Sequence, residues 1–312
     1  MGHYLITGGA GFIGSNLVEE LLKQGEKVRV LDNFSTGRRD NLKPFINDIE
    51  LVEGDIRSLS TVYRAVDGVD YVLHQAALPS VQRSVEDPIT TNEVNITGTL
   101  NVLIASRDRN VKRVVFASSS SIYGDNDSLP KREDMKPDPL SPYAAAKLTG
   151  EKYCKIFTEV YGLSTIVLRY FNVFGSRQDP TSQYSAVIPK FIYLMKNKKG
   201  LTIYGDGEQS RDFTYIKNVV NANLLACKNS DLKHEIFNCA GQEQTSINQL
   251  VKNLNEILKT DVQADYDKPR SGEVKHSLAD ISKAKSLLNY NLEVNFKDGL
   301  KKTVEWFLSL SG

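Results

Sequence analysis

Two residues suited to proton transfer, Tyr143 and Lys147, stand four positions apart at the start of a predicted helix. At this spacing both side chains project from the same face of a helix. An ammonium group beside a phenol stabilises the phenolate and lowers its pKa from about 10 towards neutrality. We therefore predict a base that removes a proton from a hydroxyl group at neutral pH. Because the chain has 14 tyrosines, one such pair can also arise by chance, so its surroundings have to support the prediction.

A run of serines, Ser118-Ser119-Ser120, follows a predicted strand at residues 113–117. The carboxyl edge of a parallel sheet is where open α/β folds bind ligands. A serine hydroxyl at that edge can hydrogen-bond to the oxygen from which Tyr143 takes a proton. Alternatively, the serines cap a helix that begins after the strand. We predict a catalytic site of Tyr143, Lys147, Ser119 and Ser120.

A glycine-rich loop, GGAGFIG at residues 8–14, lies between a predicted strand at residues 4–7 and a helix that continues to about Lys23. Its glycines at positions 8, 11 and 14 allow a turn tight enough for the backbone to approach a pyrophosphate. The N-terminus of the following helix attracts the same anion. A strand before the loop and a helix after it indicate a dinucleotide site rather than a simple turn.

The end of the second predicted strand, at residues 27–31, separates NAD from NADP. Asp32 can accept hydrogen bonds from an adenosine ribose and would repel a 2′-phosphate, so we predict NAD. Arg38 and Arg39 follow closely and leave NADP open. Segments after the third and fourth strands would line the same cleft, although packing alone can explain the alanines there. The predicted cofactor site consists of Gly8, Gly11, Phe12, Ile13, Gly14, Asp32, Asn33, Ser35, Gly37, Asp55, Ile56, Gln75, Ala76, Ala77, Tyr143 and Lys147.

The first half of the chain alternates short apolar segments typical of strands with longer segments of helical periodicity. Strand–helix–strand order at this rhythm gives right-handed crossovers and a parallel sheet. The predicted fold class is therefore α/β, a Rossmann-type doubly wound parallel sheet. The strands are predicted at residues 4–7, 27–31, 50–53, 71–74, 113–117 and 164–169, and two of the helices at 93–107 and 143–161.

After about Asn172 this alternation stops, and proline and glycine interrupt the chain. Residues 202–213 are predicted to contain a hairpin around Gly205-Asp206-Gly207. Two short amphipathic helices are predicted at 247–258 and 281–288. We expect a smaller α/β substrate-binding lobe at the carboxyl edge of the sheet. The NAD-binding domain would comprise residues 1–172, rejoined by about 214–240, and the substrate-binding domain mainly residues 173–312.

Composition and charge exclude several classes of partner. A formal net charge of +1 provides no basic surface for nucleic acid or an anionic membrane. Cys154, Cys227 and Cys239 are widely separated and odd in number, so neither a disulfide framework nor a metal site is expected. No signal peptide and no apolar run of the roughly 20 residues that a membrane helix needs are predicted. We expect a cytoplasmic protein.

Taken together, the motifs resemble those of the extended short-chain dehydrogenase/reductase family, in its nucleotide-sugar epimerase group, over essentially the whole chain. The segments that carry the resemblance are Gly8-x-x-Gly11-x-x-Gly14, SSSSIYG at 118–124, SPYxxxK at 141–147 and LRYFNVFG at 168–175. RQDP at 177–180 and VIPK at 187–190 are similar to a bacterial subgroup that acts on UDP-N-acetylhexosamines. The resemblance implies NAD as cofactor, a UDP-hexose as substrate and inversion at C4.

The resemblance also implies roles for individual residues. Tyr143 is the acid/base, Lys147 orients the nicotinamide ribose and tunes Tyr143, and Ser119 binds the reacting C4 oxygen. Guanidinium groups suit bidentate binding of phosphate, so Arg211 and Arg270 are expected to hold the diphosphate, unless each forms a surface ion pair. The implied substrate site consists of Ser80, Ser119, Tyr143, Asn172, Val187, Thr202, Tyr204, Arg211, Arg270, Glu273 and Ser277.

The implied reaction is oxidation and re-reduction on one tightly held cofactor. Tyr143 removes the C4 hydroxyl proton while hydride leaves C4 for the nicotinamide, which gives a 4-keto sugar. The sugar then turns about its phosphate linkage and receives hydride on its other face. This requires firm binding of the nucleotide and weak binding of the hexose.

Several relatives of this group perform other reactions. Dehydratases and decarboxylases carry carboxylates beside the active-site hydroxyl, where this chain has Ser120-Ser121. A reductase would need a Cys or His acid, for which His74 and His276 are the candidates, and we expect His74 to be structural. UDP-glucuronate 4-epimerase remains an alternative. A non-enzymatic NAD sensor would be expected to lack the tyrosine or the lysine, and this chain has both.

The string HSLAD at residues 276–280 bears on the choice of sugar. By the resemblance, Ser277 forms a wall of the hexose pocket, where a small residue leaves room for a 2-acetamido group. A larger pocket also admits the smaller sugar, so activity on both UDP-GlcNAc/UDP-GalNAc and UDP-glucose/UDP-galactose is expected. Alternatively, Ser277 caps a turn. Pro79 would stiffen the loop before Ser80 and weaken the preference for acetylated sugars.

The resemblance finally implies a homodimer. Helices at 93–107 and 143–161 would form a four-helix interface with those of a second copy. Their periodicity alone does not separate this interface from burial within one chain.

Overall fold

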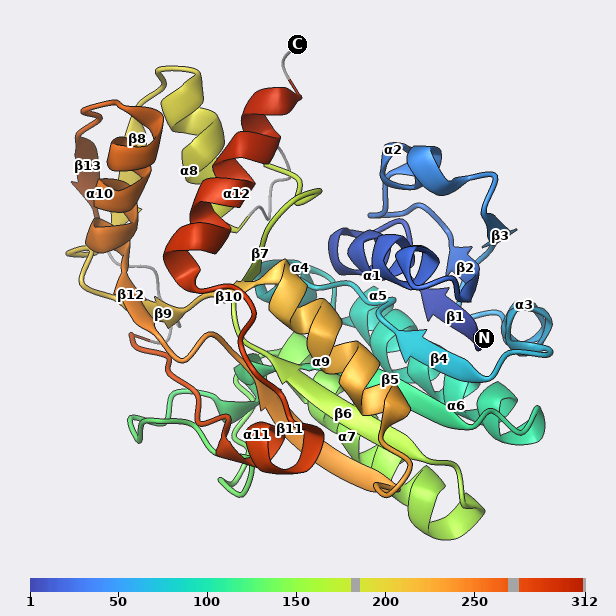
Figure 1. Cartoon of the computed structure of the whole chain (residues 1–312). Helices are drawn as coiled ribbons and strands as arrows, with labels where there is room; N and C mark the ends of the chain where they lie inside the picture. Colours follow the sequence, from blue (N-terminus) through green and yellow to red (C-terminus); the bar gives the residue numbers. More distant parts are fainter. Residues whose placement is uncertain (181–185, 269–274, 311–312) are drawn as a thin grey trace.

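Seven parallel strands form the central sheet of the computed structural model, which describes residues 1–180, 186–268 and 275–310 (Figure 1). Their order is β11-β6-β5-β4-β1-β2-β3, so the direction of winding reverses between β1 and β4. Ligands of such sheets bind at the carboxyl ends beside this reversal. The prediction of a Rossmann-type α/β fold is confirmed. The strands are β1 (His3–Thr7), β2 (Lys27–Asp32), β3 (Ile49–Glu53), β4 (Tyr71–His74), β5 (Arg113–Ser119), β6 (Thr165–Tyr170) and β11 (His234–Cys239).

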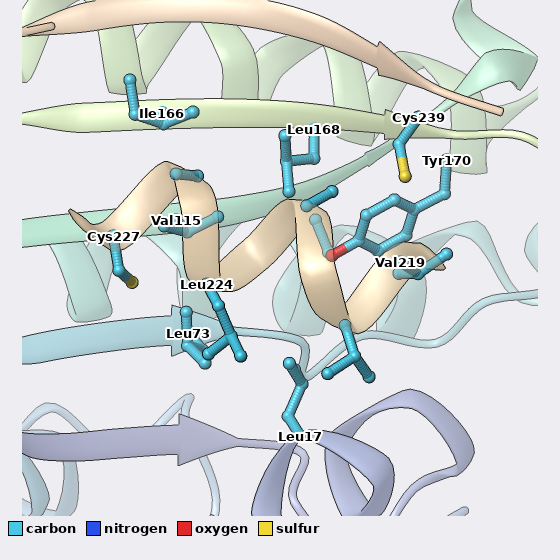
Figure 2. Close-up of a cluster of buried hydrophobic side chains, with 14 of the residues drawn as sticks. Leu17, Leu73, Val115, Ile166, Leu168, Tyr170, Val219, Leu224, Cys227 and Cys239 are labelled. Atoms are coloured by element: carbon cyan, nitrogen blue, oxygen red, sulfur yellow. The ribbon is translucent and has the colours of Figure 1, made fainter. Parts of the chain in front are cut away.

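Helices cover both faces of the sheet, because its strands are apolar on both sides. On one face, α1 (Phe12–Lys23), α9 (Ile216–Lys228) and α11 (Ser282–Leu288) contribute to the core, part of which Figure 2 shows around Leu17, Val115 and Leu224. On the other face lie α3 (Leu59–Val66), α6 (Thr99–Asp108) and α7 (Pro142–Tyr161). In the described ranges, the structure has no helix that is both long and apolar enough to span a bilayer.

The predicted helix at 93–107 is in fact assembled from several helical pieces. It begins with α5 (Pro88–Asn92), continues as a π-helix, η2 (Glu93–Gly98), and ends with α6. The π-helical segment carries Asn95, whose side-chain amide bonds both the backbone N–H (2.8 Å) and the carbonyl (3.1 Å) of Leu78. Periodicity did not predict this widening, which fixes the loop that follows β4.

A smaller lobe gathers at the carboxyl edge of the sheet (Figure 1). Its helices α8, α10 and α12 enclose a core of their own. The elements are α8 (Val187–Lys196), α10 (Ile247–Leu258), α12 (Phe296–Ser309), and the strand pairs β7 (Val173–Phe174) with β10 (Thr214–Tyr215), β8 (Leu201–Tyr204) with β13 (Ala264–Asp267), and β9 (Ser210–Asp212) with β12 (Gln244–Ser246).

The hairpin predicted within residues 202–213 is wrong. β8 pairs in parallel with β13, whereas β9 pairs in antiparallel fashion with β12. The turn between β8 and β9 is held on helix α10 instead, because Asn248 donates its backbone N–H to Gly207 (3.0 Å) and its side-chain N–H to Asp206 (3.1 Å). The remaining elements are α2 (Arg39–Leu42), η1 (Lys43–Phe45), α4 (Val81–Glu86) and η3 (Ser120–Tyr123).

Candidate active site

The start of α7 presents Tyr143 and Lys147 to the carboxyl end of β5. Ser141 caps the helix by accepting the N–H of Ala144 (3.2 Å), and Pro142 occupies the first turn, where its missing N–H costs nothing. Lys147 is buried and donates from Nζ to the carbonyl of Ala117 at 2.6 Å. The two candidate residues therefore lie one turn apart on the face of α7 that packs on the sheet.

Tyr143 is half-buried, and its phenol lies near enough to the Ser119 side chain for Ser119 to influence its pKa. Burial raises the pKa of Tyr143 above its ordinary value, and Ser119 opposes this rise. The ammonium of Lys147 lies 6.0 Å from the Tyr143 ring centroid and bonds Ala117 instead. The predicted lowering of the Tyr143 pKa by Lys147 is therefore wrong for the protein alone, where burial is the largest cause of the shift and Lys147 is not among its causes. Burial also lowers the pKa of Lys147 to about 8.

The glycine loop between β1 and α1 fits a dinucleotide. Gly8 has a φ of +71°, and a Cβ there would lie 2.8 Å from the backbone of Ala76. A Cβ on Gly14 would lie 2.2 Å from the carbonyl of Gly8, so helix and loop approach closely only with glycine. No side chain caps α1 at Gly11, which leaves the first amides of the helix for an anion. Phe12 and Ile13 form that first turn.

Asp32 lies at the carboxyl end of β2 with its carboxylate buried. The carboxylate accepts the backbone N–H groups of Ala10 and Phe34, both at 2.8 Å, and this shapes the loop around it. Arg39 donates to both carboxylate oxygens of Glu53 (2.7 Å), and Arg38 forms an ion pair with Asp179 at 3.8 Å. Both arginines are thus engaged by carboxylates, which makes them less available to a 2′-phosphate.

The loops after β2, β3 and β4 are tied to one another. Asn33 donates to the carboxylate of Asp55 at 2.9 Å and accepts the backbone N–H of Ser35 at 3.0 Å. A Cβ on Gly37 would meet both Ala10 and Asp32. These contacts bring together the remaining predicted cofactor residues at one edge of the sheet, with Ile56 buried after β3 and Gln75, Ala76 and Ala77 following β4.

A buried hydrogen-bond relay through His74 fixes the loop after β4. The Thr99 hydroxyl donates its hydrogen to the carbonyl of Asn95 (2.7 Å). It must therefore accept the hydrogen bond that it shares with His74 Nε2 (3.0 Å). His74 Nδ1 then accepts from Thr7 Oγ1 (2.7 Å), which itself accepts the N–H of Ala76 (3.2 Å). Burial lowers the pKa of His74 to about 3, so the ring is neutral. Both ring nitrogens are engaged within the protein, and His74 has a structural role.

A pocket of about 380 Å³ lies between the lobe and the sheet. Six of the predicted substrate residues line it: Ser80, Asn172, Val187, Thr202, Tyr204 and Arg211. Arg211 is held in place by donating to the carbonyls of Ser210 (2.9 Å) and Lys275 (3.1 Å). Ser80 also caps α4 by accepting the N–H of Arg83 (3.1 Å). Predicted residues Arg270 and Glu273 lie outside the described residues.

Ser277 lies beside the pocket, because it contacts Asn172, which lines the pocket. Its Oγ accepts two hydrogen bonds, from the side-chain amide of Asn172 (3.2 Å) and from the backbone N–H of Asp212 (3.1 Å). Both lone pairs are then used, so the Ser277 hydroxyl can act further only as a donor. Asp212 is buried and bonds Ala279 (3.0 Å) and Gly241 (2.7 Å), and burial raises its pKa to about 6.

Several pocket residues were missed from the sequence. Gln209, Phe213, Phe174, Lys190 and Gln82 also line the pocket. Lys190 lies in the VIPK string and Gln82 two positions after Ser80, which are the signals that could have found them. Phe174 and Phe213 come together only in the fold, where their rings meet edge to face at 6.2 Å.

Comparison with known proteins identifies the family. The model of the "NAD dependent epimerase/dehydratase family" matches residues 4–240. The chain belongs to this family. A crystal structure described as the UDP-N-acetylglucosamine 4-epimerase of Methanobrevibacter ruminantium M1 in complex with UDP-N-acetylmuramic acid superposes with a TM-score of 0.94 and 41% identity, covering 99% of each chain.

Two curated relatives show the same breadth. A putative UDP-glucose 4-epimerase of Methanocaldococcus jannaschii is 40% identical over 304 residues, 97% of each chain. A UDP-glucuronate 4-epimerase of Thermodesulfobacterium geofontis is 38% identical over 318 residues, 98% of this chain and 96% of the relative. The expected extended short-chain dehydrogenase/reductase membership and the expected NAD cofactor are confirmed. The chain is an enzyme of the UDP-sugar 4-epimerase family.

Proposed function

We propose that this protein inverts C4 of UDP-hexoses through a 4-keto sugar, acting on UDP-GlcNAc/UDP-GalNAc and on UDP-glucose/UDP-galactose. The observation that carries the proposal is the placement of Tyr143 beside Ser119 at the carboxyl edge of the sheet, where Ser119 acts on the phenol. A phenol and a hydroxyl that share one substrate oxygen suit proton transfer at a secondary alcohol. The family membership and the pocket lined by Arg211 and Asn172 support a nucleotide-linked substrate.

In the proposed reaction Tyr143 takes the proton of O4 and later returns it, while Ser119 holds that oxygen. NAD, when bound, supplies hydride acceptance and return. Arg211 retains the diphosphate through the guanidinium, so that the hexose can turn without loss of the nucleotide. Lys147 carries a charge that favours the phenolate only if its ammonium, which bonds the Ala117 carbonyl, reaches the shared site.

Room at Ser277 supports the acetylated substrates. Its side chain is short, and it is held by the backbone of Asp212 and by Asn172, which lines the pocket. The Methanobrevibacter relative, described with bound UDP-N-acetylmuramic acid, indicates that this scaffold accommodates a 2-acetamido sugar.

UDP-glucuronate is the second candidate substrate. The Ser277 hydroxyl is left to donate, and a C6 carboxylate is a strong hydrogen-bond acceptor. The relative from Thermodesulfobacterium geofontis, described as a UDP-glucuronate 4-epimerase, supports this alternative.

The test is incubation with UDP-GlcNAc, UDP-glucose and UDP-glucuronate separately, with catalytic NAD, followed by proton NMR of the anomeric signals. We expect the 4-epimers of the first two to form without net NADH. Tyr143→Phe should lower the rate by at least about 100-fold, because general acid–base catalysis is lost. Conversion of UDP-glucuronate alone would replace the proposal by the second candidate, and no epimer from any substrate would refute both.

We further propose that the chain acts as a homodimer. Val85 and Ile89 before η2 and Val160 on α7 are 65%, 72% and 66% exposed. A second copy packed on these neighbouring helices would cover them. Multi-angle light scattering should give a dimer for the wild type and a monomer for Ile89→Glu/Val160→Glu, and a wild-type monomer would contradict the proposal.

The division of labour along the chain is also proposed. Residues 1–172 together with 214–240 would bind NAD, because β11 belongs to the central sheet and α9 covers it. Residues 173–312 would mainly bind the nucleotide sugar. Calorimetry with NAD and with UDP separately should show that Gly14→Ala loses only the first and Arg211→Ala only the second. Loss of both ligands by either variant would contradict it.

A further inference from the structure

Helix α7 and strand β5 meet at three successive points. Side chains spaced by four residues on one face of α7 each interact with one of the last three residues of β5, two of them through a hydrogen bond. The pairs are Tyr143 with Ser119, Lys147 with the carbonyl of Ala117 at 2.6 Å, and Glu151 with the hydroxyl of Ser118 at 2.5 Å. Two of these pairs contain the candidate catalytic residues, and the third does not.

The third pair is built around a buried carboxylate. Glu151 and Arg169 of β6 have side chains only 2% and 3% exposed. Arg169 donates Nε to Oε1 at 3.0 Å and Nη2 to Oε2 at 2.8 Å, and Ser118 Oγ donates to Oε1. A buried ion pair is generally no more stabilising than an apolar pair of the same volume. Its use here therefore calls for a geometric reason.

We propose that Glu151, oriented by Arg169, is a positioning residue of the reaction, because its bond to Ser118 fixes the register of α7 on β5 and thereby the placement of Tyr143 and Lys147 against Ser119. This inference rests on the proposed 4-epimerase function. A slip of α7 along β5 would carry all three pairs with it, and a displacement of 1 Å can cost about 100-fold in rate.

The same carboxylate acts on Lys147 electrostatically. Burial lowers the pKa of Lys147, and Glu151, one turn further along the helix, opposes that fall. The other groups that face Lys147 are Tyr143 and Cys154, which also lie on α7, and His74 on β4. Cys154 and Glu151 both oppose the fall in the Lys147 pKa, and of the two Glu151 is the carboxylate.

The hydrogen-bond network continues from Arg169 towards the segment that contains Ser277. Arg169 donates Nη1 to the hydroxyl of Tyr123 (2.9 Å), which donates to Asn238 Oδ1 (2.7 Å). Asn238 in turn donates to the carbonyl of Asp280 (3.1 Å), three residues after Ser277. This buried set of side chains thus connects α7, which carries Tyr143, to the segment that carries Ser277.

The kinetic test uses Ser118→Ala, which keeps both charges and removes only the bond to β5. We expect kcat to fall about tenfold with KM for the UDP-sugar unchanged, and Ser118→Thr, which keeps the hydroxyl, to restore it. A kcat within twofold of wild type would overturn the positioning role, as would a rise in KM that accounts for the whole effect.

The second test does not depend on turnover. In ¹³C-lysine-labelled protein, the NMR signal absent from Lys147→Met is that of Lys147, and its titration midpoint should fall by about one pH unit in Glu151→Gln. Where Glu151→Gln does not fold, the kinetic test with Ser118→Ala, which keeps both charges, decides the inference. An unchanged midpoint overturns the electrostatic part of the inference. If the wild type epimerises no UDP-sugar, the proposed function fails, and this titration alone decides the inference.

Discussion

At the scale of single residues, Ser277 combines small size with a fixed orientation. Two N–H donors hold its oxygen, so the side chain has one remaining function, to donate into the space beyond it. Under the proposed function, its volume would decide which hexose enters, and its hydroxyl would decide which acceptor is favoured. These two properties can be separated by substitution.

Ser277→Tyr should lower kcat/KM for UDP-GlcNAc by about tenfold or more and change that for UDP-glucose by less than threefold. The phenol ring would occupy the space that the acetamido group needs, while the smaller hexose still fits. Coupled assays on both substrates measure the ratio. Ser277→Ala is the matched control, since it removes the same two hydrogen bonds but keeps the room, and an equal loss on both substrates in Ser277→Tyr would contradict the volume argument.

Residues whose chemistry is local in the sequence were predicted, and those whose partners are distant were not. Tyr143, Lys147 and the glycine loop each lie within one short motif, and the structure brings them to one edge of the sheet. Glu151 looks like an ordinary helical carboxylate until Arg169, on another element, is placed beside it. The raised pKa of Tyr143 was missed for the same reason, because burial depends on the whole fold.

At the scale of elements, the close approach of α7 to β5 depends on Gly150. A Cβ at this position would lie 2.4 Å from Cζ of Phe116, whose ring is buried and lies 5.0 Å from the Lys147 ammonium. Glycine in a helix ordinarily costs about 1 kcal/mol relative to alanine. The sequence therefore places a weak helix former where the three α7–β5 pairs need a short separation.

Gly150→Ala should lower both the melting temperature and kcat. Overpacking costs about 1–3 kcal/mol and outweighs the gain of about 1 kcal/mol in helix propensity, because the Phe116 ring is enclosed. Calorimetry and the epimerase assay measure the two effects. Gly200→Ala is the control, since a Cβ there meets no atom within 4 Å. A Gly150→Ala variant that is more stable and fully active would show that α7 can move outward freely.

Elements were predicted well where a cap or a period marks them. Helix α10 begins and ends where its periodicity indicated, after Ser246, which accepts the N–H of Gln249 at 3.1 Å. The hairpin prediction failed because β8 and β9 are short and each pairs with a strand far away in the sequence. β8 pairs with β13, 63 residues further along (Leu201 with Ala264), and β9 pairs with β12, 32 to 36 residues further along (Asp212 with Gln244, Ser210 with Ser246). The π-helix η2 failed because it follows from a tertiary contact, that of Asn95 with Leu78.

At the scale of the whole molecule, the parallel α/β sheet followed from the alternation of strands and helices, whereas the order of its seven strands was not predicted. The seventh strand, β11, was expected only as a return of the chain within about 214–240, since no motif marks it. The relay through His74 joins β1, β4 and the helices behind them at the centre of the sheet. Its charge state should therefore be visible in the stability of the entire fold.

We expect the protein to lose stability as the pH falls below 6.5, in part through His74. The folded-state pKa of about 3 lies below the ordinary value of 6.5, so between these limits the unfolded chain binds a proton that the folded protein does not. Stability due to this group is complete above pH 6.5 and is lost progressively towards pH 3, by about 2 kcal/mol at pH 5.

Urea unfolding at pH 7 and pH 5 should show this loss of stability. In His74→Gln the difference in stability between the two pH values should be smaller by about 2 kcal/mol, whatever the stability of the variant at pH 7. An equal difference in wild type and His74→Gln would mean that the folded protein accommodates a charged His74, and that the relay is not what fixes the loop after β4.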